Sequence, residues 1–339
     1  QSRAIYEMLR AAGSEPWDDD ARTYECELTT LQVAFRSKWH KRLFRVLIPF
    51  LLPLFRRRLE LLALFLTKEC CHQIETNYCD IVISCGATAI PFALLLRQEN
   101  HAKNVVIMKP PFPYLFFHHD LIITHAHDRM QEGARVVRTL VAPAFINKTS
   151  FAEYKEALCN AFALDRTVRY ACILIGGDTK KYAFDPALFS FQFKMLIQTL
   201  LQLRYHVVVT NSRRTRDDIT KIMHEVCAQY EDCDVVIDVY RNNRPHAVAG
   251  MLALSDVVIV TEESVSMISE AIQCGKKVLI IKPSHDSLAP KHRRFHAYVQ
   301  KEHLIESADF DKLESQMEHL LQSRCAVHVI RQNHMRIAG

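Results

Sequence analysis

The hydrophobic positions of this chain gather into short runs rich in valine and isoleucine, separated by longer amphipathic segments. Runs that are apolar on both sides of the backbone are typical of strands in a parallel sheet that helices cover on both faces. The pattern therefore predicts a repeated β-α-β architecture. The predicted strands are residues 80–84, 104–108, 120–124 and 135–141 in the first half, and 170–175, 206–210, 234–238, 257–261 and 278–281 in the second.

The amphipathic segments between these strands divide the chain into two halves. Residues 143–168 form a connecting segment with one helix, and a helix at 309–321 ends the second half. We predict an α/β fold of two doubly wound, Rossmann-like domains that face each other across a cleft. The predicted domains are residues 1–145 and 146–339. The other predicted helices are a segment ending near residue 97, and 186–203, 216–229, 246–254 and 264–274.

The chain begins with a helical pattern at residues 1–12, followed by a short predicted strand at 23–30. A doubly wound domain usually opens with a strand and its loop. We therefore expect the first strand of the N-terminal domain to be missing before Gln1.

Composition limits the classes of function. An apolar content of 49% with 24% charged residues is typical of a globular protein, and a net charge of +5 does not by itself indicate nucleic-acid binding. The 11 cysteines follow no C-x-x-C or zinc-ligand spacing. We therefore expect reduced core cysteines, no metal site and a cytoplasmic location.

The chain has only eight glycines, and two of them, Gly176 and Gly177, follow a predicted strand directly. Glycine lets the backbone approach a ligand closely, and neighbouring amides can converge on an anion. The loop continues with a hydroxyl and a cation, at Thr179 and Lys180. This combination indicates a phosphate-binding loop, although two glycines can also form a simple turn.

Two further strand ends in the second half carry polar residues of the same kind. Ser212 and Arg213 follow one strand, and Glu263, Ser264 and Ser266 follow another. Because the carboxyl ends of parallel strands meet at one edge, these loops are expected to converge with the glycine loop. Hydroxyls, an arginine and a helix N-terminus are suited to a diphosphate. Taken singly, each serine can instead be a helix cap.

Three more residues are candidates for chemistry. Glu270 lies on the helix that begins near Ser264, where a carboxylate can accept hydrogen bonds from ribose hydroxyls or simply be solvated. His127 and Asp128 end a strand of the first half, where a histidine oriented by an aspartate can act as a general base. Capping of the next helix is an equally good interpretation of these two residues.

The segment 36–66 combines apolar residues with positive charge. No acidic residue occurs from Leu28 to Leu59. An apolar run interrupted by Pro49 and Pro53 is too short to span a bilayer, and its basic flanks favour contact with an anionic membrane surface. A buried helix whose ends carry cations is the alternative. The basic residues are Arg36, Lys38, Lys41, Arg42, Arg45, Arg56, Arg57 and Arg58.

Four segments together resemble the elongated-mitochondria (mitochondrial fission) family. They are Ile175–Tyr182, Thr210–Thr215, Thr261–Ala271 and Lys291–His296. His127-Asp128 is also similar to the strand-end His-Asp of that family. The resemblance covers about residues 80 to 305 and implies a glycosyltransferase of the GT-B fold. The first half departs from the family at Gly86–Thr88, where a more basic stretch is usual.

The resemblance also implies roles for the two halves. Gly177, Thr179, Ser212, Arg213 and Ser264 are expected around the donor diphosphate, and Glu270 at its ribose. The first half is expected to receive the acceptor, because the segment 36–66 is similar to that of enzymes that glycosylate membrane lipids.

Two hypotheses remain open at the level of sequence. One is a metal-independent glycosyltransferase that uses a nucleotide-diphosphate sugar and a lipid-linked or envelope-glycan acceptor, peripheral on the inner face of the cytoplasmic membrane. The other is a non-catalytic adaptor of mitochondrial-fission type, on the mitochondrial outer surface. A nicotinamide enzyme is disfavoured because no Gly-x-Gly-x-x-Gly follows a strand, and nucleic-acid binding because no aromatic platform accompanies the basic residues.

Overall fold

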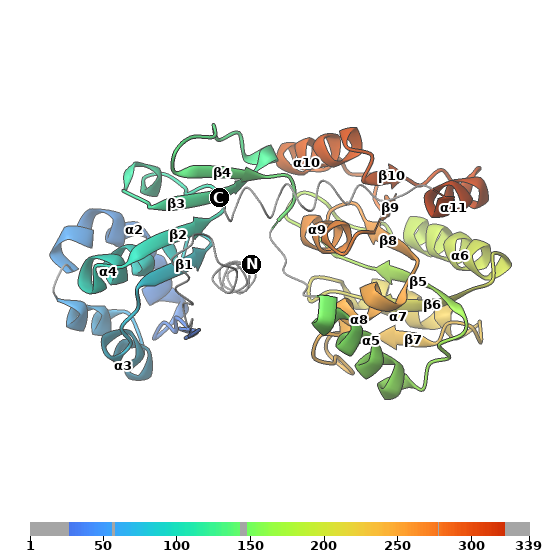
Figure 1. Cartoon of the computed structure of the whole chain (residues 1–339), viewed down its shortest axis with the longest axis horizontal. Coiled ribbons are helices and arrows are strands. Elements are labelled where there is room, and N and C mark those ends of the chain that lie inside the picture. Colours follow the sequence, from blue (N-terminus) through green and yellow to red (C-terminus); the bar gives the residue numbers. More distant parts are fainter. Residues whose placement is uncertain (1–26, 56–57, 143–147, 277, 323–339) are drawn as a thin grey trace, which may run out of the picture. The chain divides into compact units, whose positions relative to one another are not determined.

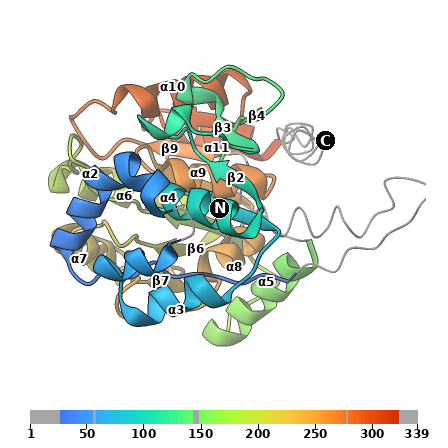
Figure 2. The same cartoon turned by 90° about the vertical axis from the view of Figure 1, so that its left-hand side faces the viewer.

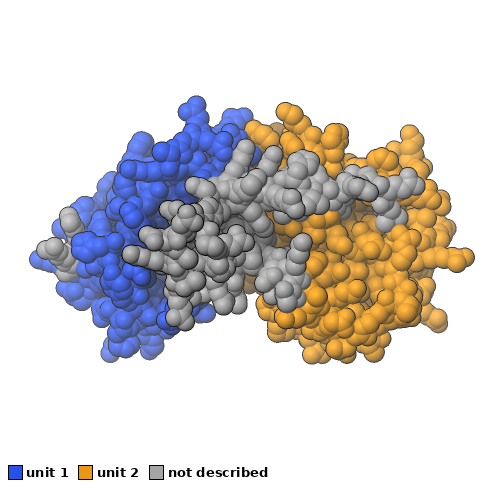
Figure 3. Space-filling model, viewed as in Figure 1, with its two compact units in different colours: residues 1–139, 334–339 blue, residues 140–333 orange. Residues whose placement is uncertain are grey.

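The computed structural model describes residues 27–55, 58–142, 148–276 and 278–322. The predicted helix 1–12, residues 23–26 of the predicted strand 23–30, and Arg56 and Arg57 lie outside these ranges, whereas residues 27–30 are described and form no strand. The chain forms two compact units, residues 1–139 with 334–339 and residues 140–333 (Figure 3). The division between Thr139 and Leu140 falls close to the predicted domain boundary after residue 145.

Unit 1 contains a sheet of four parallel strands in the order β1-β2-β3-β4 (Figure 1). The strands are β1 (Ile81–Cys85), β2 (Lys103–Ile107), β3 (Leu121–His125) and β4 (Val136–Thr139). Each strand pairs with the next in sequence, and the register places Ile81 opposite Lys103. Helix α4 (Ile90–Asn100) packs against β1 and β2. The four strands lie where the apolar runs predict them.

Helix α2 (Lys38–Phe55) packs in turn against α4 (Figures 1 and 2). Its inner face buries Phe44, Ile48 and Leu52, and the Phe44 ring stacks on Phe92 with 5.0 Å between ring centroids. Each fully buried side chain of this size stabilises the fold by about 1.5–3 kcal/mol. The remaining short elements of unit 1 are η1 (Leu59–Leu64), α3 (Lys68–Thr76), η2 (Tyr114–Phe116) and η3 (Ala126–Asp128).

Pro49 and Pro53, which interrupt the apolar run in the sequence, lie inside α2, and the helix continues through both. A proline in a helix leaves the carbonyl four residues earlier without its amide partner. The carbonyls concerned belong to Arg45, which is exposed, and to Pro49, which is half-buried. Neither residue is buried, and the solvent side of a helix tolerates unpaired carbonyls most easily.

Unit 2 contains a parallel sheet of six strands in the order β10-β9-β8-β5-β6-β7. This is the order of a dinucleotide-binding Rossmann sheet, with β5 in the position of its first strand. The prediction of an α/β fold with Rossmann-like, doubly wound domains is therefore confirmed for this unit. The strands are β5 (Arg169–Leu174), β6 (Tyr205–Thr210), β7 (Val235–Ile237), β8 (Val257–Thr261), β9 (Val278–Ile281) and β10 (Ile305–Ser307).

Helices cover both faces of the unit 2 sheet. Helix α6 begins with Pro186 directly after Asp185, whose carboxylate accepts a hydrogen bond from the Leu188 amide at 2.9 Å. Neither α10 nor β10 was expected from the sequence. The helices are α5 (Lys148–Phe162), α6 (Pro186–Gln202), α7 (Asp217–Cys227), α8 (Ala247–Leu254), α9 (Val265–Gln273), α10 (Pro290–Lys301) and α11 (Leu313–Gln322).

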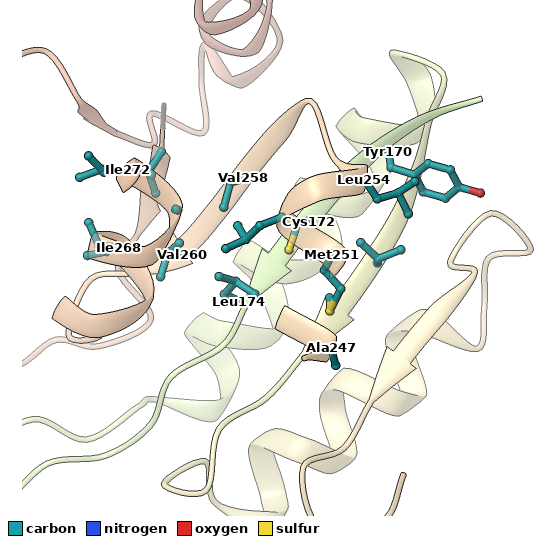
Figure 4. Close-up of a cluster of buried hydrophobic side chains, with 14 of the residues drawn as sticks. Tyr170, Cys172, Leu174, Ala247, Met251, Leu254, Val258, Val260, Ile268 and Ile272 are labelled. Carbon is teal, nitrogen blue, oxygen red and sulfur yellow. The ribbon is translucent and has the colours of Figure 1, made fainter. Parts of the chain in front are cut away.

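The central strand β5 sends alternate side chains into two separate cores. Cys172 and Leu174 pack with residues of β8, α8 and α9 (Figure 4). Ala171 and Ile173 pack on the opposite face, in the core that α6 and α7 cover. Because both faces of β5 are buried, the strand is apolar throughout, which is the pattern expected for a central parallel strand. This double burial fixes the position of the loop that follows β5.

Among the described residues, no helix combines the length and the apolar character needed to cross a bilayer.

Candidate functional site

The candidate site lies at the carboxyl edge of the unit 2 sheet, where the strand order changes direction. From β5 the chain moves to β6 on one side, and later returns to β8 on the other. In open parallel sheets, ligands bind at such a switch point, between the loops that follow the two central strands. Here those loops contain Gly176-Gly177 after β5 and Glu262-Glu263-Ser264 after β8.

Hydrogen bonds join the glycine loop to the β8 loop. The Gly176 amide donates to Thr261 Oγ1 at 2.8 Å, and the Gly177 amide donates to Glu263 Oε1 at 2.8 Å. The two amides that were expected to donate to phosphate thus donate to neighbouring side chains in this structure.

The glycines are needed for close packing of loops. A Cβ atom on Gly176 would lie 1.7 Å from Glu263 Oε1. A Cβ atom on Gly177 would lie 2.3 Å from the carbonyl carbon of Arg214. Real Cβ atoms essentially never make such contacts, so only glycine fits at these two positions. The close approach that was expected of a ligand is made here by the β6 and β8 loops.

The β6 loop is joined to the same place by Thr215. Its hydroxyl donates to the carbonyl oxygen of Gly176 and accepts a hydrogen bond from the Ser212 amide at 2.9 Å. Ser212 Oγ in turn accepts from the Arg214 amide at 3.2 Å, which closes a compact turn. Loops after β5, β6 and β8 thus meet at one edge, as predicted. Sequence reasoning did not predict that Thr215 joins two loops, although Thr215 is the last residue of the Thr210–Thr215 segment that resembles the family.

Glu263 is the buried centre of this arrangement, with only 1% of its surface exposed. Oε1 accepts hydrogen bonds from the Gly177 amide and from Thr261 Oγ1, whereas Oε2 has no hydrogen-bond partner among the described residues. Burial raises the pKa of Glu263 to about 7, because the charged form loses its hydration. The sequence placed this residue at the donor, whereas the structure places it beneath the rim.

The glycine loop is also tied down by Asp178, another residue that sequence reasoning missed. Its carboxylate accepts from the Phe184 amide at 3.0 Å and pairs with Arg216 Nη1 at 2.9 Å. Thr179 forms a tight turn through its amide, which donates to the Tyr182 carbonyl at 2.8 Å. Lys180, in that turn, is exposed to solvent. Of the two predicted residues, Lys180 therefore has the side chain that is free to move toward a ligand.

Two arginines follow Ser212, and the structure gives them different surroundings. Arg213 is exposed, and its carbonyl accepts a hydrogen bond from the Tyr240 hydroxyl at 2.9 Å. Arg214 is also exposed, but its positive charge acts on the pKa of Glu263 and of His292. The Arg214 backbone also lies against Gly177, within 2.3 Å of where a Cβ atom on that glycine would be, so Arg214 lies at the switch point, which the motif does not reveal.

Helix α9 begins at the same edge. Ser264 is buried at its N-cap position, and its side chain makes no capping hydrogen bond to the helix. Ser266 is exposed in the first turn. The positive end of a helix favours an anion, and the hydroxyl of Ser266 adds a donor there. Glu270 lies further along α9, half-buried, and burial raises its pKa.

Helix α10 contributes two histidines that sequence reasoning did not place at the site. His296 Nε2 donates to the Glu262 carbonyl at 2.7 Å, so its proton is on Nε2. Burial lowers the pKa of His296 and of His292, and the positive charges of Lys291 and Arg214 lower that of His292 further. The Lys291–His296 segment is one of the four segments that resemble the family. That resemblance was the one indication in the sequence that His296 contacts the β8 loop.

In unit 1, His127 and Asp128 follow β3 as predicted. His127 Nε2 lies 3.9 Å from Asp128 Oδ1, and the imidazole is 2% exposed. The ring stacks on His125 with 5.3 Å between centroids. Within the described ranges, no group of three or more His, Cys, Asp or Glu side chains is arranged to hold a metal ion.

Several solved structures are similar to this chain at low sequence identity. A UDP co-structure of S. aureus MnaA is 12% identical with a TM-score of 0.49, and covers 100% of this chain and 89% of that one. The α,α-trehalose-phosphate synthase (UDP-forming) from Burkholderia xenovorans is 13% identical with a TM-score of 0.46, and covers 88% and 76%. The fold assignment rests on the strand order described above.

Two proteins of known sequence match part of the chain. Mitochondrial fission protein ELM1 of Arabidopsis thaliana is 23% identical over 232 residues, which are 60% of this chain and 52% of that protein. The uncharacterized protein RP120 of Rickettsia prowazekii is 24% identical over 247 residues, or 64% and 68%. The match thus spans about half the length of the Arabidopsis relative.

The sequence model of the family described as Mitochondrial fission ELM1 matches residues 8–333, which is nearly the whole chain. This match includes all three loops at the switch point of unit 2. The chain belongs to the mitochondrial fission ELM1 family.

Proposed function

We propose that this protein is a glycosyltransferase that binds a nucleotide-diphosphate sugar at the carboxyl edge of the unit 2 sheet. The observation that carries the proposal is the hydrogen-bonded convergence of the β5, β6 and β8 loops at the switch point. Two of the similar solved structures are associated with UDP by name, the trehalose-phosphate synthase described as UDP-forming and the co-structure of MnaA with UDP.

In this proposal the diphosphate meets the rim above the loops rather than the glycine amides. The first turn of α9 offers its amides and the Ser266 hydroxyl. Arg213, Arg214 and Lys180 offer exposed cations from the two neighbouring loops. Positive groups at this place would stabilise the charge that a leaving diphosphate gains in the transition state, in the role that a metal ion has in other enzymes.

Calorimetric titration of the full chain with UDP-, GDP-, ADP- and CMP-sugars tests the proposal. We expect one nucleotide class to bind, and Arg213→Gln to weaken that binding by about 1–3 kcal/mol if the guanidinium contacts phosphate. Arg204→Gln is the matched control, because Arg204 is exposed just before β6, at the opposite edge of the sheet. Equal affinities of both variants would remove Arg213 from the site.

The acceptor in this proposal is a lipid-linked molecule or an envelope glycan, reached from the cytoplasmic side of a membrane. His127, with Asp128 beside it, is the proposed base for the acceptor hydroxyl. Its burial requires that the acceptor reach the end of β3. Turnover that is unchanged in His127→Ala, with the fold intact, would contradict this assignment.

A second candidate is a non-catalytic adaptor of mitochondrial-fission type, as in the second sequence-based hypothesis. The observation that favours it is the internal use of the glycine amides, together with the carboxyl group of Glu263 under the rim. A carboxylate there opposes binding of an anion. A folded protein that binds none of the four nucleotide sugars would support the adaptor.

A further inference from the structure

Helix α2 has an outer apolar face that is largely exposed in the described part of unit 1. Trp39, Val46, Phe50 and Leu54 recur at intervals of seven and four residues, which places them on one side of the helix. Phe50 is 78% exposed, and the other three are each more than half exposed. The inner face, described above, already supplies the contact with α4. A helix that is apolar on both sides is typical of a segment with a second apolar environment.

A loop anchored in the same core as α2 carries two further exposed apolar side chains. Phe112 and Phe116 are 81% and 78% exposed, and their rings meet edge to face with 6.0 Å between centroids. Between them, Tyr114 is buried in the same core cluster as the inner face of α2. The Tyr114 carbonyl also accepts a hydrogen bond from His119 Nε2 at 2.9 Å. The loop is therefore anchored next to α2 while its two phenylalanines remain in solvent.

Positive charge accompanies these apolar side chains. Lys38, Arg42 and Arg45 are exposed along the first half of α2, and none of them forms an ion pair within the described residues. Arg45 lies close enough to Tyr114 for its charge to act on the pKa of the tyrosine, which burial raises to about 12. The absence of acidic residues from Leu28 to Leu59 leaves this charge uncompensated along the chain.

We propose that unit 1 docks on an anionic lipid bilayer through this surface, which we call the α2 docking face. It consists of Trp39, Val46, Phe50 and Leu54 of α2, Phe112 and Phe116 of the adjacent loop, and the cations Lys38, Arg42 and Arg45. The apolar side chains enter the boundary between headgroups and acyl chains, and the cations remain at the lipid phosphates.

The composition of the face favours a bilayer over other partners. Tryptophan and phenylalanine partition into the interfacial region of membranes, where one side of a helix can remain in water. A nucleic acid would meet the cations but leave Val46 and Leu54 without a suitable contact. A protein partner would need an acidic apolar groove of matching shape, whereas an anionic bilayer supplies both properties over a continuous surface. This docking does not depend on binding of a nucleotide sugar.

The first test uses the full chain and two kinds of vesicle. The chain contains two tryptophans, so Trp17→Phe leaves Trp39 as the single fluorescent reporter. We expect its emission to shift to shorter wavelength with vesicles of phosphatidylcholine mixed with phosphatidylserine, but not with phosphatidylcholine alone. High salt should weaken the response, because the lipid charge is screened.

Variants then distinguish binding through the α2 docking face from nonspecific adsorption to vesicles. In vesicle flotation, Phe50→Gln combined with Phe116→Gln should abolish binding. Arg42→Gln combined with Arg45→Gln should lower the partition coefficient about tenfold or more. Phe191→Gln is the matched control, because Phe191 is 57% exposed on α6 of unit 2 and lies outside the face. It should bind as the unaltered protein does.

Several results would overturn the proposal. One is a folded full chain that does not float with phosphatidylserine vesicles at low salt. Another is unchanged flotation of the Phe50→Gln/Phe116→Gln variant. Self-association in sedimentation that this variant abolishes would make the face an interface between copies of the chain. Nucleotide-sugar affinity is measured without vesicles, and membrane docking is measured without a nucleotide sugar. A negative result for one proposal therefore does not decide the other.

Discussion

The contact between Gly176 and Glu263 gives a prediction that the geometry determines closely. In Gly176→Ala, the new Cβ would lie 1.7 Å from Glu263 Oε1 and 3.0 Å from Ser264 Cβ. The carboxyl group must therefore move by more than an ångström to restore an ordinary contact. Such a movement breaks the 2.8 Å hydrogen bond from the Gly177 amide and the 3.2 Å hydrogen bond from Thr261.

The expected loss of stability follows from these two effects. Overpacking of a filled site costs about 1–3 kcal/mol, and each lost hydrogen bond about 0.5–1.5 kcal/mol. We expect Gly176→Ala to lower the free energy of unfolding of unit 2 by about 3 kcal/mol. In the background Glu263→Ala the clashing atoms are absent, so the same glycine substitution should cost only about 1 kcal/mol. The coupling energy of the pair is then about 2 kcal/mol.

Amide hydrogen exchange of the β5 core is a suitable assay, because it reports the opening of unit 2 separately from unit 1. It is measured on the unaltered protein, both single variants and the double variant. Gly250→Ala is the control, since its Cβ would meet Tyr154 O at 2.7 Å, away from Glu263. Its effect should add to that of Glu263→Ala. If Gly176→Ala costs the same with and without the Glu263 side chain, the packing argument is wrong.

Three further predictions concern pH and hydrogen bonding. The pKa of Glu263 is raised from 4.5 to about 7, so stability should fall by on the order of 3 kcal/mol as the pH rises through that range; thermal unfolding of Glu263→Gln should lack this decline. Thr215→Val, which loses the hydroxyl that donates to Gly176, should destabilise unit 2 by about 1–3 kcal/mol in urea unfolding, with unchanged stability as the contrary result. Burial alone would raise the pKa of Asp120, but hydrogen bonds from Arg97 and a backbone amide lower it overall. Its stabilising effect should therefore be present above its ordinary pKa of 3.8 and be lost in stronger acid, and circular dichroism should show a smaller acid loss in Asp120→Asn.

Much of unit 2 could be predicted from the sequence because its strands are buried on both faces. Apolar runs such as Val257–Thr261 have no alternative environment in a globular protein, so their position and parallel pairing follow from pattern alone. The convergence of the polar loops also followed, since it depends only on strand direction. In contrast, β10 has one buried apolar residue, Ile305, followed by Glu306 and Ser307, so no apolar run marks it.

The roles of individual site residues could not be predicted in the same way. Whether the Gly177 amide faces a ligand or Glu263 depends on a contact between residues 86 positions apart, which no local pattern encodes. Arg213 and Arg214 are adjacent and chemically identical, so the sequence cannot say which lies nearer the switch point. In α2, the sequence shows that Pro49 and Pro53 interrupt an apolar run, but no local pattern shows that the helix continues through both.

Glu263 connects the stability of the site with the choice between the two candidate functions. Its carboxyl group joins the β5 and β8 loops, so the rim needs this residue whether or not a ligand binds there. Because its pKa is raised to about 7, the group is largely neutral in mild acid and increasingly charged above neutrality. A neutral Glu263 holds the loops without opposing an anion, whereas an ionised one opposes the phosphates of a donor. The glycosyltransferase proposal therefore predicts that donor affinity falls as the pH rises through 7, and that it falls less in Glu263→Gln. The adaptor proposal predicts no donor binding at any pH.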